Sequence, residues 1–149
     1  MNKCSLTWED LIDFTERNYR KNRTIVSRDI PVIFDDLELT VGLPVERFAY
    51  KSGEDHGTWV VPPRWDVREA WLKDAAGEII SSYDDHPLFV SPYSSPVRAT
   101  LSRDELLAHT VSHPGQSNAY QYNWRFALDA RLRLQGWGLS LPQDLIDRL

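Results

Sequence analysis

The stretch "GTWVVPPRWDVREAWLKDAAGEI", residues 57–79, decides the fold. It begins with the β-branched run "TWVV", and two adjacent prolines follow. Next come "VREAWLKD" and "EIISSY", joined by Ala75-Ala76-Gly77, a short connection with a glycine where a positive φ costs little. The pattern predicts a strand, a stiff proline corner with tryptophans packed beneath it, and a β-hairpin.

Helices are expected on the N-terminal side of this stretch. Residues 7–20, "TWEDLIDFTERNYR", place apolar side chains at helical spacing behind Thr7 as a cap. Residues 28–39, "RDIPVIFDDLEL", indicate a second helix with Asp29 as cap and Pro31 in its first turn, ending at Gly42. The alternation in "VERFAYKSG", residues 45–53, predicts a strand.

Downstream, the three prolines of "PLFVSPYSSPV", residues 87–97, are too dense for a central strand and favour an irregular segment, either an edge strand or an extended, ordered loop. Ser102 with Glu105 forms a capping-box pattern for a helix expected to end at His113-Pro114-Gly115. An amphipathic helix is expected within residues 117–135, and a short one begins near Pro142.

The elements together predict an α+β protein: a small β-rich sheet or hairpin flanked by N-terminal helices and C-terminal amphipathic helices. We expect an N-terminal helical segment and strand at residues 1–50 and a β-rich part with C-terminal helices at 51–149, packed as one unit.

Composition excludes several classes of protein. The chain has 149 residues, 42% of them hydrophobic and 26% charged, which is typical of a soluble globular domain. A net charge of -5 argues against a nucleic-acid partner. The single cysteine, Cys4, cannot form an internal disulfide and favours the cytoplasm, and no run approaches the ~20 apolar residues of a membrane helix.

Two groups of side chains are candidates for chemistry. His109 and His113 have the i, i+4 spacing of a metal pair, but Thr110 stands where a zinc-protease helix needs glutamate, so a helix-end histidine contacting carbonyls is the favoured interpretation. The tryptophans at 59, 65 and 71 are either core anchors or the wall of a ligand site, with burial favoured. The residues indicate no cofactor within this chain.

The order of motifs adds a resemblance. "TWVVPPRWDVREAWLKDAAGEII", residues 58–80, resembles the W-x-V-P-x-x-W-x-[IV]-R-x-A signature of the M28-like zinc aminopeptidases, a group of aminopeptidase-like domains of unknown function. The family's other motifs are matched in order by "NRTI" (22–25), "LFVSPYSSPV" (88–97), "LSRDELLAH" (101–109) and "WGLSLPQ" (137–143). His109 falls on a family histidine, whereas Phe89 replaces one, and the spacing between Tyr120 and Trp137 is longer than in the family.

The resemblance implies a peptidase whose parallel sheet binds two zinc ions, with this chain supplying the N-terminal part and its inserted β-rich domain. The family's metal ligands would lie downstream of Leu149, so zinc is implied for the complete enzyme and not for this chain, and whether the chain is itself an enzyme stays open. It would shape a substrate cleft, with the catalytic domain of the same or a companion polypeptide, or a second copy, as partner.

Two alternatives remain beside that hypothesis. One is a stand-alone peptide- or protein-binding module that has lost catalysis, and the other is a self-contained enzyme that uses His109 and nearby acids. Arg23 is a candidate to contact a carboxylate of a substrate or of the missing domain, because guanidinium binds carboxylates bidentately, although a structural ion pair with one of the many acids is the favoured interpretation. The candidate ligand-binding residues are Arg23, Trp59, Trp65, Tyr93 and His109.

Overall fold

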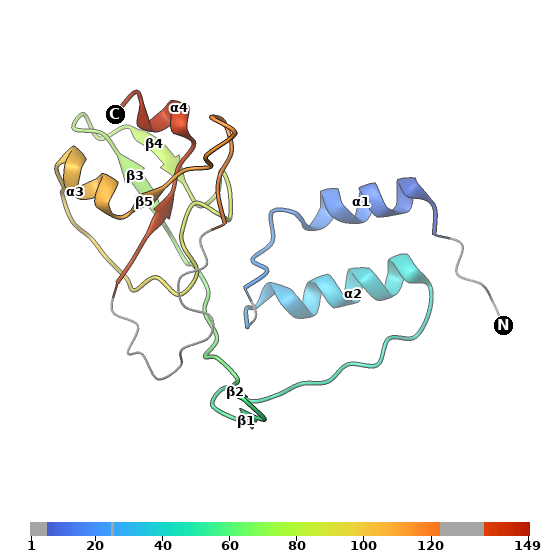
Figure 1. Ribbon diagram of the computed structural model, residues 1–149. Helices are drawn as coiled ribbons and strands as arrows, with labels where there is room; N and C mark the ends of the chain where they lie inside the picture. The colour runs from blue at the N-terminus through green and yellow to red at the C-terminus, as the bar shows by residue number, and fades with distance from the viewer. Residues whose placement is uncertain (1–5, 25, 123–135) are drawn as a thin grey trace. The chain divides into compact units, whose positions relative to one another are not determined.

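A computed structural model describes residues 6–24, 26–122 and 136–149 (Figure 1). The chain divides into two compact units, one ending at Asp66 and the other beginning at Val67. Helices and short two-stranded sheets occur in it, so the predicted α+β class is confirmed. The amphipathic helix expected within residues 117–135 falls largely outside the described residues.

Two helices dominate the first unit. Helix α1 (Trp8–Asn18) begins with the predicted Thr7 cap, in a reciprocal capping box with Asp10. Helix α2 (Asp29–Val41) ends at Gly42 as predicted, with φ 66°. The prediction that Asp29 caps α2 is wrong. Arg28 occupies the cap position and makes no side-chain cap bond, while Asp29 is the first residue of the helix and its carboxylate accepts the Asn22 N–H at 2.8 Å.

The first unit also contains one small hairpin. Strands β1 (Asp55–His56) and β2 (Trp59–Val60) pair antiparallel, which confirms a strand in "TWVV". The prediction of a strand at residues 45–53 is wrong, because this segment pairs with no strand in the described part of the chain. Its side chains from 46 to 53 are all exposed, so the alternation in its sequence buries no face.

The second unit contains the predicted hairpin. Strands β3 (Trp71–Lys73) and β4 (Ile79–Ser82) pair antiparallel around a turn with Gly77 at φ 91°. Helix α3 (Arg103–Ala108) has the predicted capping box of Ser102 and Glu105. It ends earlier than expected, because His109 is its C-cap and strand β5 (Thr110–Val111) follows at once.

A central strand organises the second unit. Strand β6 (Leu139–Ser140) pairs parallel with β5 and forms an antiparallel bridge to Val90 in the proline-rich segment. That segment forms no strand of its own, so of the two alternatives the extended loop is the one observed. Helix α4 (Gln143–Ile146) follows Pro142 and completes the unit.

The apolar core lies mainly in the second unit. The buried hydrophobic residues of the second unit are Phe89, Val90, Tyr93, Leu106, Leu141 and Ile146. In the described part of the first unit, Val61 is the one buried hydrophobic residue of this kind. Buried polar residues of the first unit are Asn18, Asn22 and Ser27. No helix within the described ranges is both long and apolar enough to cross a membrane.

Candidate functional site

The turn between α1 and α2 is built around Asn22, a buried residue of the "NRTI" motif. Its side-chain amide donates to the carbonyl of Trp65 at 3.2 Å, and its side-chain oxygen accepts the Thr24 N–H at 3.0 Å. Its backbone carbonyl accepts the hydroxyl of the buried Ser27 at 2.6 Å. The motif therefore joins the helical turn to the segment that follows the two prolines.

Trp65 and Asp66 complete this junction. The Trp65 N–H donates to the Val26 carbonyl at 2.9 Å, and the Asp66 carboxylate accepts the Arg28 N–H at 2.8 Å and the Arg64 guanidinium at 2.5 Å. Burial acts to raise the pKa of Asp66, but the Arg28 amide and the Arg64 guanidinium outweigh it and hold the pKa below its usual value. Trp65 is thus fixed through its backbone and is half-buried.

The other predicted ligand residues of the first unit are accessible. Arg23 is exposed and donates to the Asn18 carbonyl at 3.2 Å; it forms no ion pair within the described residues. Trp59 on β2 is 43% exposed and Trp71 on β3 is 42% exposed, so the favoured interpretation of both as buried core anchors is wrong. The Trp59 ring centroid lies 6.1 Å from that of His56. His56 in turn makes an edge contact with Tyr50 at 4.1 Å.

The contact between α1 and α2 is polar. Arg17 Nε lies 3.0 and 3.2 Å from the two Asp36 carboxylate oxygens, and its Nη2 donates to the Thr40 hydroxyl at 3.0 Å. The buried Asn18 also donates its side-chain amide to Asp36. The hydrogen bond from Arg17 is the main reason why the pKa of Asp36 lies below its usual value, with Asn18 second.

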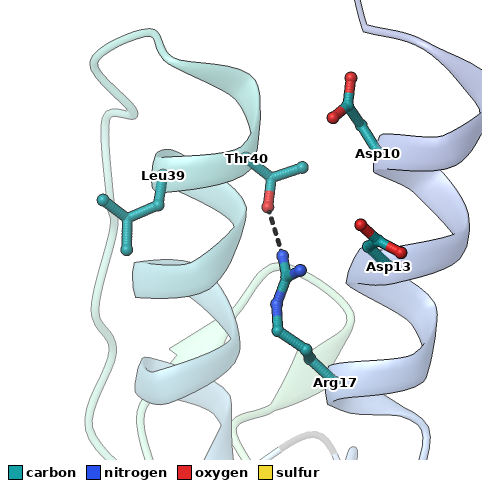
Figure 2. Close-up of a pocket in the computed structure, with 5 residues that line it drawn as sticks. All are labelled: Asp10, Asp13, Arg17, Leu39 and Thr40. Atoms are coloured by element: carbon teal, nitrogen blue, oxygen red, sulfur yellow. Dashed lines mark hydrogen bonds between the residues drawn. The ribbon is translucent and has the colours of Figure 1, made fainter.

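A small open hollow of about 230 Å³ lies beside this contact, lined by Asp10, Asp13, Arg17, Leu39 and Thr40. Figure 2 shows the side chains of Asp10, Asp13 and Arg17 directed from α1 toward α2. Asp10 is held by Thr7, whose backbone N–H and hydroxyl lower the pKa of Asp10. The hollow combines two carboxylates with a guanidinium that already binds Asp36.

In the second unit, Tyr93 lies in a strained turn. It is 5% exposed and has φ 62°, the left-handed region that residues other than glycine rarely adopt. Burial, followed by the nearby Tyr122, raises the pKa of Tyr93 to about 12. The turn is held by Ser94, whose hydroxyl donates to the Ser91 carbonyl at 2.7 Å and accepts the Gly138 N–H at 3.1 Å.

His109 lies beside β6, whose Leu139 N–H donates to the His109 carbonyl, on the side opposite the Tyr93 segment. Its ring stacks on Trp137 with centroids 4.0 Å apart, and its Nδ1 is 3.2 Å from the Trp137 carbonyl oxygen. A carbonyl only accepts, so in this hydrogen bond Nδ1 is the donor. His113 lies beyond β5 and not on the helix of His109, so the two do not form the i, i+4 pair.

The structure therefore brings three distant motifs together. Residues 91 and 95 donate backbone N–H groups to the carbonyls of Gly138 and Gly136, and Leu139 donates to the His109 carbonyl at 2.9 Å. Tyr93 and His109 thus flank residues 136–139 in the second unit, whereas Arg23, Trp59 and Trp65 belong to the first. The described residues contain no group of three or more His, Cys, Asp or Glu side chains that could hold a metal ion.

Two features of these sites were not expected from the sequence. Trp137 stacks on His109, but the two residues, in the motifs "WGLSLPQ" and "LSRDELLAH", lie 28 positions apart, and no local spacing pairs them. The Arg17–Asp36 contact joins residues 19 positions apart on two helices, and no local spacing indicates such a pair.

Comparison with known proteins places this fold in longer chains. A protein of Clostridium acetobutylicum, provisionally named a polysaccharide biosynthesis protein with an aminopeptidase-like domain, is 30% identical over 107 residues, 72% of this chain but 23% of its own. The crystal structure of a provisionally named peptidase from the same organism superposes with a TM-score of 0.80 at 26% identity, over 95% of this chain and 32% of that one.

This chain therefore spans about a quarter to a third of the relatives that it matches. Their names support a peptidase-like or aminopeptidase-like family and specify no metal. The family described as a domain of unknown function, DUF2172, matches residues 64–149. Since that match covers more than half of the chain, the protein belongs to the DUF2172 family.

Proposed function

We propose that this chain is a non-catalytic module of an aminopeptidase-like metalloenzyme, one that shapes the substrate cleft while the metal ligands reside in other residues. One observation carries the proposal: nearly the whole fold corresponds to a third of the crystallised relative, which leaves most of that protein for the chemistry. The catalytic part would be the module's partner, in the same or a companion polypeptide.

The chemistry of the side chains agrees with a non-catalytic role. A zinc hydrolase of the proposed class needs several His, Asp or Glu ligands converging on one site. The described residues offer no such group. Zinc therefore does not fit the described part of this chain, and no catalytic step is assigned to it.

The first test measures the chain by itself. We expect the purified chain to retain well under one equivalent of zinc after dialysis, by metal analysis, and to leave aminoacyl p-nitroanilides intact. The variant His109→Ala should bind the same trace amount of metal. Stoichiometric zinc that disappears in His109→Ala, together with hydrolysis, would show a self-contained enzyme instead.

The second test places the chain in a complete enzyme. In a chimera, this chain replaces the matching third of the crystallised Clostridium protein, and zinc content and aminoacyl p-nitroanilide hydrolysis are compared with the parent. We expect the chimera to fold, bind zinc and keep measurable activity. A chimera that fails to fold or to bind zinc when the parent does both would contradict the proposal.

A stand-alone peptide-binding module is the second candidate, because exposed aromatic rings cluster in the first unit. Tyr50 is 52% and Trp59 43% exposed, and both contact His56. Such rings can form a wall for an apolar peptide side chain. Binding of short peptides that Trp59→Ala abolishes, together with a chimera without activity, would favour this function over the first.

A further inference from the structure

Helix α1 presents its polar face to α2. Arg17 and Asn18 bond to Asp36 of α2, and Asp10 and Asp13 line the hollow beside Leu39 and Thr40 (Figure 2). In a helix with 3.6 residues per turn, positions 10, 13 and 17 share one side. An amphipathic helix ordinarily does the reverse and turns its apolar side to its neighbour.

The apolar side of α1 is left open as a result. Trp8, Leu11, Ile12 and the C-cap Tyr19 lie opposite the polar face and form what we call the α1 stripe. Their exposed fractions are 71%, 44%, 40% and 41%. These large side chains share one half of the helix surface, with the Arg20 guanidinium 5.5 Å from the Tyr19 ring centroid. Exposed apolar side chains grouped in this way mark a contact with another protein segment.

Symmetric pairing of two copies through this stripe is disfavoured by size. Helix α1 has 11 residues and is therefore about 16 Å long. One such helix on each side provides much less contact than the roughly 1,200 Å² that stable interfaces bury. A contact of this size suffices where the partner is held close by other means, as within one longer polypeptide.

The charges beside the stripe indicate the chemistry of that partner. Helix α1 carries the acids Glu9, Asp10, Asp13 and Glu16 against the single base Arg17, which is bound to Asp36. Glu9 and Glu16 are seven positions apart and so border the stripe on one side. An apolar patch with lysine or arginine along that edge would be complementary.

We propose that the α1 stripe docks onto the aminopeptidase-like portion that the relatives carry beyond the matched region, at an apolar patch with a basic rim. The inference rests on the proposed function, and it names the surface through which the module is joined to the enzyme. The relatives provide the length that is needed, since this fold accounts for 32% of the crystallised chain. Docking would cover Trp8 and Ile12 together.

Hydrogen exchange of α1 amides tests the docking. The isolated chain is compared with the full-length chimera that carries it in the Clostridium protein. We expect α1 to exchange at least tenfold more slowly in the chimera, and Ile12→Asp to remove this protection. Ile79→Asp is the matched control, because Ile79 is 59% exposed and lies in the second unit; it should leave α1 protected.

The outcomes separate the two proposals. A folded, active chimera in which α1 exchanges as fast as in the isolated chain overturns the docking and leaves the proposed function intact. Equal loss of protection in Ile12→Asp and Ile79→Asp also overturns it. A concentration-dependent dimer of the isolated chain that Ile12→Asp dissociates would assign the stripe to a second copy, and a chimera that does not fold counts against the proposed function.

Discussion

Tyr93 shows how a single residue can carry both strain and burial. Its left-handed backbone at φ 62° costs on the order of 1 to 2 kcal/mol, which the packing of its buried ring and the bonds of Ser94 must offset. A phenol buried in this way ionises with difficulty, which is why the pKa of Tyr93 rises from 10.0 to about 12.

That pKa predicts a loss of stability in alkali. Above pH 10 the unfolded chain releases the Tyr93 proton while the folded chain keeps it, so the free energy of unfolding falls as pH rises from 10 to about 12. The loss assigned to this group is at most about 2 to 3 kcal/mol over the whole range, and about half of it falls between pH 9 and pH 11. Tyr93→Phe should lack it, when urea unfolding at pH 9 and pH 11 is compared.

Tyr50→Phe is the control for that experiment, because Tyr50 is 52% exposed and belongs to the other unit. It should retain the alkaline loss of the wild type. An equal loss in Tyr93→Phe and wild type would mean that the Tyr93 phenol ionises as freely in the folded protein as in the unfolded chain.

At the scale of elements, the turn between α1 and α2 depends on Asn22. Replacing it with Ala removes the amide that binds the Trp65 carbonyl and the oxygen that accepts the Thr24 N–H. Two partners would lose their bonds at a buried position, so we expect a loss of about 1 to 3 kcal/mol in the free energy of unfolding of the first unit.

Urea unfolding followed by circular dichroism measures this loss. Asn118→Ala is the matched control, because Asn118 is exposed in the second unit, and it should change stability by less than about 0.5 kcal/mol. If Asn22→Ala were as stable as Asn118→Ala, the hydrogen bonds of Asn22 would not hold the turn.

Local chemistry determined which elements could be predicted from the sequence. Thr7 and Ser102 each satisfy an N–H group of the first turn of their own helix, and Gly77 closes a hairpin. Each of these contacts spans only a few residues of the chain. The caps and turns could therefore be predicted. The residue type of Asp29 favours a cap position, but its bond to the backbone N–H of Asn22, seven residues away, determines its role.

Contacts between distant segments explain the remaining differences. Strand β5 exists because residues 139–141 run beside it, and a two-residue strand has too little sequence to show a pattern. The resemblance pointed to His109 and Tyr93 as candidate residues. It could not indicate their partners, since Trp137 lies 28 positions from His109.

At the scale of the whole molecule, the two units differ in what stabilises them. The second unit buries Phe89 and Leu141 almost completely, with β6 hydrogen-bonded on both sides. Neither α1 nor α2 buries an apolar side chain, and they are joined by polar contacts. Since burial of apolar surface is the main favourable term in folding, stability should be concentrated in the second unit.

Native-state hydrogen exchange of the isolated chain measures this difference directly. We expect the amides of Leu139 and Leu141, which bond to β5 and its flank, to be among the slowest, and those of α2 to exchange at least a hundredfold faster. Low concentrations of urea should abolish the protection of α1 and α2 first. Equal protection in both units would mean that they unfold as one cooperative body, and it would contradict the prediction that stability is concentrated in the second unit.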